Sequence, residues 1–399
     1  PAITRFLKDS DPSQLNKSKL KYTINILLEK NNISHKELFK AFNFLYNKKI
    51  VNYLKRFESD VIKEESSKFL INDKVIINAM KKITFKDISL ERVLTDARKN
   101  MCNRIAMNEK ELSNSQLKLI ITLGEQCFLN EYIYSVNEEE KILIDKIINR
   151  CIDGKINETN ISILSCYFPL YKLLHKIPSL KIFYTTNPSF NDLIKLQILE
   201  PLQEIELSKN IKRIGSIEDN ISQKVKVQYE ENPYPRWRYG NSYKEQKISI
   251  NESINNEIKP NNININLDNK PLKVLIAGCG TGNQILQSQR YHNAKVTSID
   301  LSLSSLSYAQ RKINELEIDN VELIQMDILE VNLLEEQFDI IECSGVLHHM
   351  DNPSKGLKLL LGILKEKGFL KLGLYSELAR QDIVEARNYI ASKNLTQTT

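Results

Sequence analysis

Apolar residues recur at intervals of three and four along the first 210 residues, a pattern typical of α-helices. Ser34 and Glu37 have the spacing of a capping box at the start of one of these helices. Glycine is scarce before residue 230, where only Gly124, Gly154 and Gly215 occur. We therefore predict an all-helical domain over residues 1–215, with helical patterns at 15–60, 88–106, 115–134, 137–151, 161–175 and 191–208.

The hydrophobic pattern changes at residue 271, where short apolar runs begin to alternate with helical patterns. Such alternation predicts an α/β doubly wound fold with parallel strands and right-handed crossovers. Ligands of these folds bind at the carboxyl ends of the strands. We expect strands at 273–277, 295–299, 321–325, 338–343 and 369–374, and helices at 283–291, 303–316, 353–366 and 377–393.

Three glycines follow the first strand at alternate positions, Gly278, Gly280 and Gly282. Glycines permit positive φ and let a ligand lie against bare backbone, and the start of the next helix favours a negative group. Asp300 ends the second strand, where its carboxylate can accept both hydroxyls of a ribose. The dinucleotide fingerprint places its third glycine three residues after the second, so the even spacing here disfavours a pyrophosphate ligand.

The next two strand ends carry further polar groups. Asp327 lies between Met326 and Ile328, so its carboxylate could accept an adenine amine while the apolar neighbours enclose the ring. Ser344 ends the fourth strand. Either acid alone could be a helix cap or a turn residue. The order and spacing of three strand ends favour a nucleoside site.

His348 and His349 follow the fourth strand and admit three interpretations: metal binding, a catalytic contact such as that of a base, or a packing or capping role. Neighbouring residues point to different sides and no third ligand is near in sequence, so we expect no metal site. The six cysteines form no CxxC pair and are expected to be ordinary buried residues. No catalytic residue or general base can be assigned from the sequence.

The stretch Tyr229–Trp237, YEENPYPRW, lies in an expected linker over residues 216–270. The residues before its two prolines are restricted to extended geometry, so the segment should be stiff. It could be a rigid strap between domains or an aromatic gate facing the substrate. A second aromatic stretch, QCFLNEYIY, places Phe128, Tyr132 and Ile133 at helical spacing, which favours core positions.

Composition limits the classes of protein. The chain has 399 residues, of which 41% are hydrophobic and 27% charged, and it starts at Pro1 rather than Met. It has neither an apolar run of about 20 residues nor a signal core, so we expect a cytoplasmic protein without membrane insertion. The net charge of +6 divides into +9 over 1–270 and −3 over 271–399. An acidic or nucleic-acid partner is conceivable, but the absence of a dense basic run favours a solvated surface.

The motifs AGCGTG, SID, MDI and SGVLHHM together make residues 273–376 similar to class I S-adenosylmethionine (SAM) methyltransferases. The resemblance implies SAM as the cofactor of a transferase. In the sheet of this family, two further strands follow the fifth. The resemblance therefore implies that these C-terminal strands are missing from the sequence that ends at Thr399. The implied cofactor-binding residues are Gly278, Gly280, Gly282, Asp300, Leu301, Asp327, Ile328 and Ser344.

The combination of QCFLNEYIY, QYEENPYPRW and LYSELARQDIVEAR also resembles a narrower bacterial group that includes the rickettsial protein-lysine methyltransferases of outer membrane protein B. This resemblance implies lysine methylation of a bacterial surface protein, with a helical domain that binds substrate or dimerises. On this basis the expected acceptor residues are Tyr234, Trp237, Tyr239 and His348. A small-molecule or RNA methyltransferase, and a non-enzymatic scaffold with a vestigial SAM fold, remain alternatives.

Overall fold

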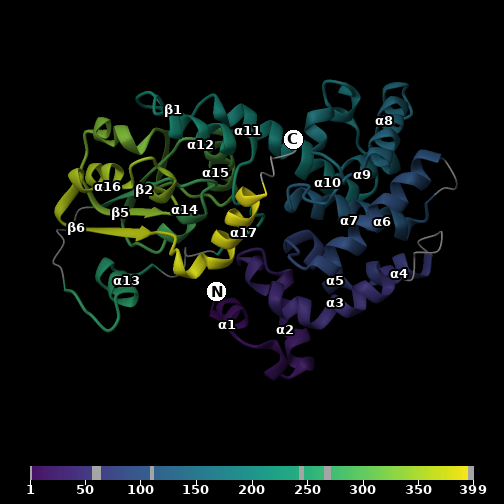
Figure 1. The fold of residues 1–399 in the computed structure, drawn as a ribbon, viewed down its shortest axis with the longest axis horizontal. Helices are drawn as coiled ribbons and strands as arrows, with labels where there is room; N and C mark the ends of the chain where they lie inside the picture. The colour runs from purple at the N-terminus through teal and green to yellow at the C-terminus, as the bar shows by residue number, and fades with distance from the viewer. Residues whose placement is uncertain (1, 56–63, 108–111, 242–246, 265–270, 394–399) are drawn as a thin grey trace. The chain divides into compact units, whose positions relative to one another are not determined.

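The computed structural model describes residues 2–55, 64–107, 112–241, 247–264 and 271–393. These residues form two compact units (Figure 1). The first contains Pro1–Gln203 and Arg236–Ser242, and the second contains Glu204–Pro235 and Tyr243–Thr399. The division differs from the expected boundaries at 215 and 270, because segments assigned to a linker pack with the sheet.

The first unit is helical, as the three-and-four pattern predicts. Its hydrophobic core is continuous, and Leu28, Phe42, Ile76 and Phe190 are completely buried within it. The expected helix at 161–175 is broken after α9, and the helix α11 continues from α10 through a π-helical turn at Lys195–Leu199. Its helices are α1 (Ala2–Asp9), α2 (Lys17–Glu29), α3 (Phe39–Lys55), α4 (Glu64–Asn72), α5 (Lys74–Lys82), α6 (Ile88–Met107), α7 (Asn114–Leu129), α8 (Glu138–Ile152), α9 (Glu158–Leu164), α10 (Pro188–Ile194) and α11 (Glu200–Ser208), the last of which crosses the boundary of the unit.

Two local expectations for this unit are wrong. Ser34 makes no side-chain capping bond, because the chain enters α3 through a 3-10 turn and the Ser34 N–H donates to Oδ1 of Asn241. Capping boxes occur instead at the starts of α7 and α8. Ile133 is 68% exposed, because α7 ends at Leu129 and only the aromatic residues before it face the core.

The second unit contains a six-stranded parallel sheet of order β1-β4-β3-β2-β5-β6 within the described residues. The five expected strands are present. The sixth, β1, was missed because two residues carry no periodic signal; it pairs with Ile324 and Gln325 at the sheet edge. The strands are β1 (Lys212–Arg213), β2 (Leu272–Ala277), β3 (Ala294–Asp300), β4 (Val321–Gln325), β5 (Phe338–Ser344) and β6 (Leu364–Gly373).

Helices cover both faces of this sheet, and Figure 1 shows α14, α15 and α16 around β2, β5 and β6. Val274 and Ile276 of β2 pack with apolar residues of α13, α14 and α15. Leu275 and Ala277 point to the other face and pack with residues of α16 and two 3-10 turns. The helices are α12 (Asn220–Glu231), α13 (Ile250–Glu257), α14 (Asn283–Ser288), α15 (Leu303–Glu315), α16 (Pro353–Gly362) and α17 (Gln381–Ser392).

The strand register places the functional candidates together. Ala277 pairs with Ile299, Asp300 pairs with Gln325, and Ser344 pairs with Gly373, so these strands end at one edge of the sheet. Parallel strands place their carboxyl ends side by side, which is where a ligand crevice forms. No helix among the described residues has the length and apolarity needed to cross a membrane.

Candidate functional site

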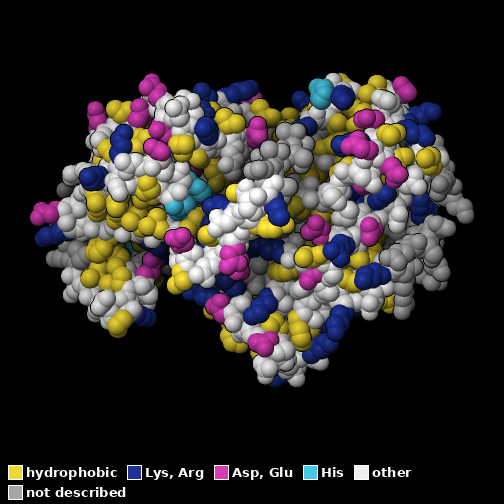
Figure 2. Space-filling model, in the orientation of Figure 1, with side chains coloured by type: hydrophobic (Ala, Val, Ile, Leu, Met, Phe, Trp, Pro, Cys, Tyr) yellow, Lys and Arg dark blue, Asp and Glu magenta, His cyan; other side chains and the backbone are white. Residues whose placement is uncertain are grey.

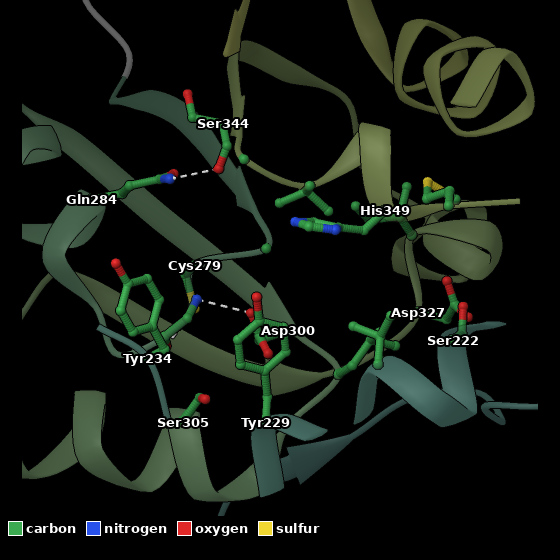
Figure 3. Close-up of a pocket in the computed structure, with 18 of the residues that line it drawn as sticks. Ser222, Tyr229, Tyr234, Cys279, Gln284, Asp300, Ser305, Asp327, Ser344 and His349 are labelled. Atoms are coloured by element: carbon green, nitrogen blue, oxygen red, sulfur yellow. Dashed lines mark hydrogen bonds between the residues drawn. The ribbon is translucent and has the colours of Figure 1, made fainter. Parts of the chain in front are cut away.

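A cavity of about 280 Å³ lies at the carboxyl ends of the strands (Figure 3). Its size is close to the lower end of small-molecule sites, roughly 300 Å³. Seven of the eight residues expected to bind cofactor line it: Gly278, Gly280, Asp300, Leu301, Asp327, Ile328 and Ser344. The other lining residues are Ser222, Val225, Tyr229, Tyr234, Pro235, Cys279, Asn283, Gln284, Ser305, Met326, Gly345, Val346, His349, Met350 and Tyr375.

Asp300 is held rigidly at the end of β3. Its Oδ2 accepts the Gly280 N–H at 2.8 Å, and its Oδ1 accepts the Ser302 N–H at 2.9 Å. Burial raises the pKa of this carboxyl, and the two N–H groups partly oppose that rise. A carboxylate offers about four acceptor positions, so two remain for the hydroxyl pair of a ribose.

The glycine turn brings its backbone close to the cavity. Gly278 has φ +77°, and a Cβ added there would lie 2.3 Å from Cγ2 of Val346. Gly282 has a different role, because it caps α14 with φ +88° and a Cβ there would lie 2.9 Å from Cβ of Ala309. Gly282 therefore permits close packing of α14 on α15 and is not part of the cavity lining.

Asp327 follows β4 and begins a 3-10 turn. One carboxylate oxygen accepts the Leu329 N–H at 2.9 Å, so Oδ2 can accept from an exocyclic amine. Met326 and Ile328 line the same part of the cavity, as the sequence pattern predicts. At the end of β5, the Ser344 carbonyl accepts Nε2 of Gln284 at 3.1 Å, which ties this strand to α14 (Figure 3).

One wall of the cavity comes from α12, which sequence analysis assigned to a linker. Ser222, Val225 and Tyr229 of this helix line the cavity. Oε1 of Glu230 accepts the Leu303 N–H at 2.7 Å, and Oε2 accepts the N–H and hydroxyl of Ser304 at 3.0 and 2.7 Å. The acid therefore satisfies the exposed N–H groups at the start of α15 and fixes α12 there. In the sequence, this wall was marked only by Glu230 and Glu231, which stand shortly before Pro233 and Pro235.

We expect Glu230→Gln to lower the free energy of unfolding of this unit by about 1–2 kcal/mol, because an amide replaces a charged acceptor. Chemical denaturation measures this change. Glu231→Gln is the matched control, since Glu231 is exposed beside it. Equal stability of the two variants would show that the Glu230 bonds do not hold α12 in place.

The stretch 229–239, which contains the YEENPYPRW segment and the two residues after it, has contacts within each unit. Within the second unit, Tyr234 lines the cavity and the Thr281 hydroxyl donates to the Pro235 carbonyl at 2.6 Å. Within the first unit, Arg238 pairs with buried Glu125, and the Tyr239 ring lies 5.4 Å from that of His35. Of the expected acceptor residues on this segment, only Tyr234 lies in the cavity lining. Roles for Trp237 and Tyr239 in acceptor binding stay predictions.

The two histidines have different surroundings. His349 lines the cavity, and its imidazole extends into it (Figure 3). His348 is outside the lining. Its ring is tilted against that of Tyr375, with the two centroids 3.7 Å apart, and the guanidinium carbon of Arg380 lies 3.8 Å from the centroid of the same tyrosine ring. No group of three His, Cys, Asp or Glu side chains in the described part of the chain could hold a metal ion.

Comparison with known proteins relates this part of the chain to methyltransferases. The family described as a methyltransferase domain matches residues 274–368. An uncharacterised protein of Synechococcus sp. is 32% identical, covering 30% of this chain and 29% of its own. A tRNA U34 carboxymethyltransferase of Campylobacter curvus is 27% identical, covering 44% of this chain and 63% of its own. The chain thus matches less than two thirds of the length of either relative.

Among solved structures, PKMT2 from Rickettsia typhi in complex with AdoHcy is 26% identical, covering 32% of this chain and 26% of its own, with a TM-score of 0.28. The residues that match the family model contain most of the parallel sheet, and they also contain Asp300 and Asp327 at its strand ends. The chain therefore carries a class I SAM-dependent methyltransferase domain, with SAM as its cofactor.

Proposed function

We propose that the protein transfers the methyl group of SAM to a lysine amine of a protein substrate. The observation that carries this proposal is that three tyrosines, Tyr229, Tyr234 and Tyr375, line the same cavity as Asp300 and Asp327. Aromatic walls suit an unbranched apolar chain that ends in an amine, and the ring faces of Tyr229 and Tyr234 can attract ammonium and methylammonium groups. The ring of Tyr375 already contacts His348 and Arg380, so it contributes apolar surface.

The residues of the cavity fit the cofactor. Asp300 has two acceptor positions left for a ribose, Asp327 can offer its Oδ2 to adenine, and the bare backbone at Gly278 and Gly280 can approach the methionine part. When bound, SAM supplies an activated methyl group on a sulfonium. The task of the protein is then to align the acceptor, exclude water and remove the proton of the amine.

Positive charge near Tyr375 would help to remove the proton from the lysine ammonium. Arg380 stacks on Tyr375, which lines the cavity, so an ammonium entering there meets a nearby cation. Like charge and desolvation both lower the pKa of an amine. Both of these effects favour loss of the proton from a lysine in this cavity.

The resemblance to rickettsial methyltransferases favours a surface protein such as outer membrane protein B as substrate, with the helical unit binding it or joining two copies. A small-molecule or RNA substrate is the alternative, since every cofactor residue would be shared. On the face drawn in Figure 2, Lys and Arg side chains are interspersed with Asp and Glu. That distribution offers RNA no continuous basic track.

The deciding experiment incubates the purified chain and methyl-labelled SAM with a fragment of outer membrane protein B, a metabolite extract and bulk tRNA. We expect label on protein lysines, located by mass spectrometry, and much less of it with Asp300→Ala at a SAM concentration that does not saturate the variant. Label only in metabolites or RNA would contradict the lysine proposal. A chain that binds no SAM in calorimetry would instead be a scaffold.

A further inference from the structure

We propose that His349 is the catalytic base that takes the proton from the acceptor amine. This inference rests on the proposed function and assigns a residue to a step for which the sequence offers none. Its imidazole extends into the cavity that Asp300, Asp327 and Tyr229 also line (Figure 3).

The other ionisable side chains of the described lining are unsuited to this step. Asp300 accepts two backbone N–H groups, and Asp327 accepts one as a cap and faces apolar neighbours. Cys279 is buried and the pKa of its thiol is raised by burial. Burial raises the pKa of the Tyr229 phenol, which makes it less able to act as a phenolate base. His349 alone among these groups offers a neutral nitrogen lone pair at pH 7.

The neighbours of His349 keep its ring neutral and in place. His348 lies 4.4 Å away, and Tyr375 presents its edge at 5.9 Å. Burial lowers the pKa of His349, and the charges of Arg380 and Arg387 lower it further. Asp300 and Asp327 are the acids of the same cavity. A histidine surrounded in this way is unprotonated at pH 7 and ready to accept a proton.

The rings of His348 and Tyr375 contact the His349 imidazole, and Tyr375 in turn contacts His348 and Arg380. His348 has both ring nitrogens buried without a hydrogen-bond partner, so its contribution is contact rather than proton transfer. It is a positioning residue, for which a phenyl ring should substitute. His349 itself has an exposed side, which gives the proton a path to solvent.

The imidazole nitrogen takes one proton from the lysine ammonium, leaving a neutral amine. The amine lone pair forms the new C–N bond as the C–S bond breaks, and the electron pair of that bond stays on sulfur. The imidazolium of His349 then releases its proton to water.

A first test measures binding without turnover. An imidazolium in the cavity would repel the cationic sulfonium of SAM but not the neutral sulfur of S-adenosylhomocysteine. We expect SAM affinity to fall, relative to that of S-adenosylhomocysteine, as the pH drops through the pKa of His349. His349→Gln should abolish this difference, and His292→Gln, an exposed histidine of the same unit outside the cavity lining, should keep it. An unchanged difference in His349→Gln would overturn the proposal.

A second test measures methyl transfer. We expect His349→Gln to lower the rate at neutral pH by about 100-fold or more at unchanged SAM affinity. The variant should regain about tenfold per pH unit above neutral, because the acceptor then loses its proton to solvent. His348→Phe should retain most activity, and His348→Ala should lose part of it without this pH dependence.

The outcomes separate the two proposals. A loss in His349→Gln that is the same at every pH, or no loss, would reject His349 as the base while leaving lysine methylation intact. A wild-type chain that binds SAM with the expected pH dependence but labels no protein amine would reject the proposed function, and the base assignment for lysine with it.

Discussion

Gly278→Ala is expected to weaken SAM binding by at least about 100-fold. Its φ of +77° is a conformation that costs an alanine roughly 1–2 kcal/mol. The new methyl group would also lie 2.3 Å from Cγ2 of Val346, which itself lines the cavity. Relief of such overpacking costs about 1–3 kcal/mol and moves atoms into the space for the ligand. Calorimetric titration with SAM measures the effect.

Two further variants separate the clash from general damage. Gly362→Ala is the matched control, because a Cβ at Gly362 meets nothing within 4 Å; its SAM affinity should equal that of the unaltered chain. Adding Val346→Ala to Gly278→Ala should recover part of the affinity, since the nearest contact disappears while the strained φ remains. If Gly278→Ala binds SAM normally, the glycine turn does not border the bound cofactor.

Asp300→Ala is expected to weaken SAM binding by about 10- to 100-fold, corresponding to about 1.5–3 kcal/mol for hydrogen bonds to a charged acceptor. The variant loses the ribose contacts and also leaves the Gly280 and Ser302 N–H groups without their acceptor. The turn should therefore loosen, and the free energy of unfolding should fall in parallel. Calorimetry and chemical denaturation measure the two effects.

Asp300→Asn distinguishes the two contributions, because it keeps the shape of the side chain and one oxygen. We expect it to retain more stability than Asp300→Ala while losing most of the SAM affinity, since an amide offers fewer acceptor positions. A SAM affinity that is the same in all three forms would show that the ribose is not held by this residue.

The sheet and the cofactor side of the cavity were predictable because their signals are local. Each strand is a short apolar run, and the expected ligand residues stand at the end of a strand or a few residues beyond it. Since parallel strands end at one edge, the position of Asp300 and Asp327 in sequence was enough to bring them together. The eighth residue, Gly282, was placed correctly in the turn but supports the packing of α14 rather than the cavity.

The proposed acceptor side of the cavity was less predictable because its residues come from distant parts of the chain. Tyr229 lies more than seventy residues before Asp300 and Tyr375 as many after it, and no spacing rule relates them. Choosing between His348 and His349 required the side-chain directions at a 3-10 turn, which two adjacent identical residues do not reveal. The weak amphipathic pattern of α12 likewise gave no indication that it packs on α15.

The assignment of Glu204–Pro235 to the sheet unit affects how the protein can be divided for study. A truncation that starts at the family match, near residue 274, would remove β1, α12 and Tyr234. Such a fragment would keep Asp300 and Asp327 but would remove Ser222, Val225, Tyr229, Tyr234 and Pro235 from the cavity lining. Screening for inhibitors of this enzyme class therefore calls for a clone that starts upstream of Glu204.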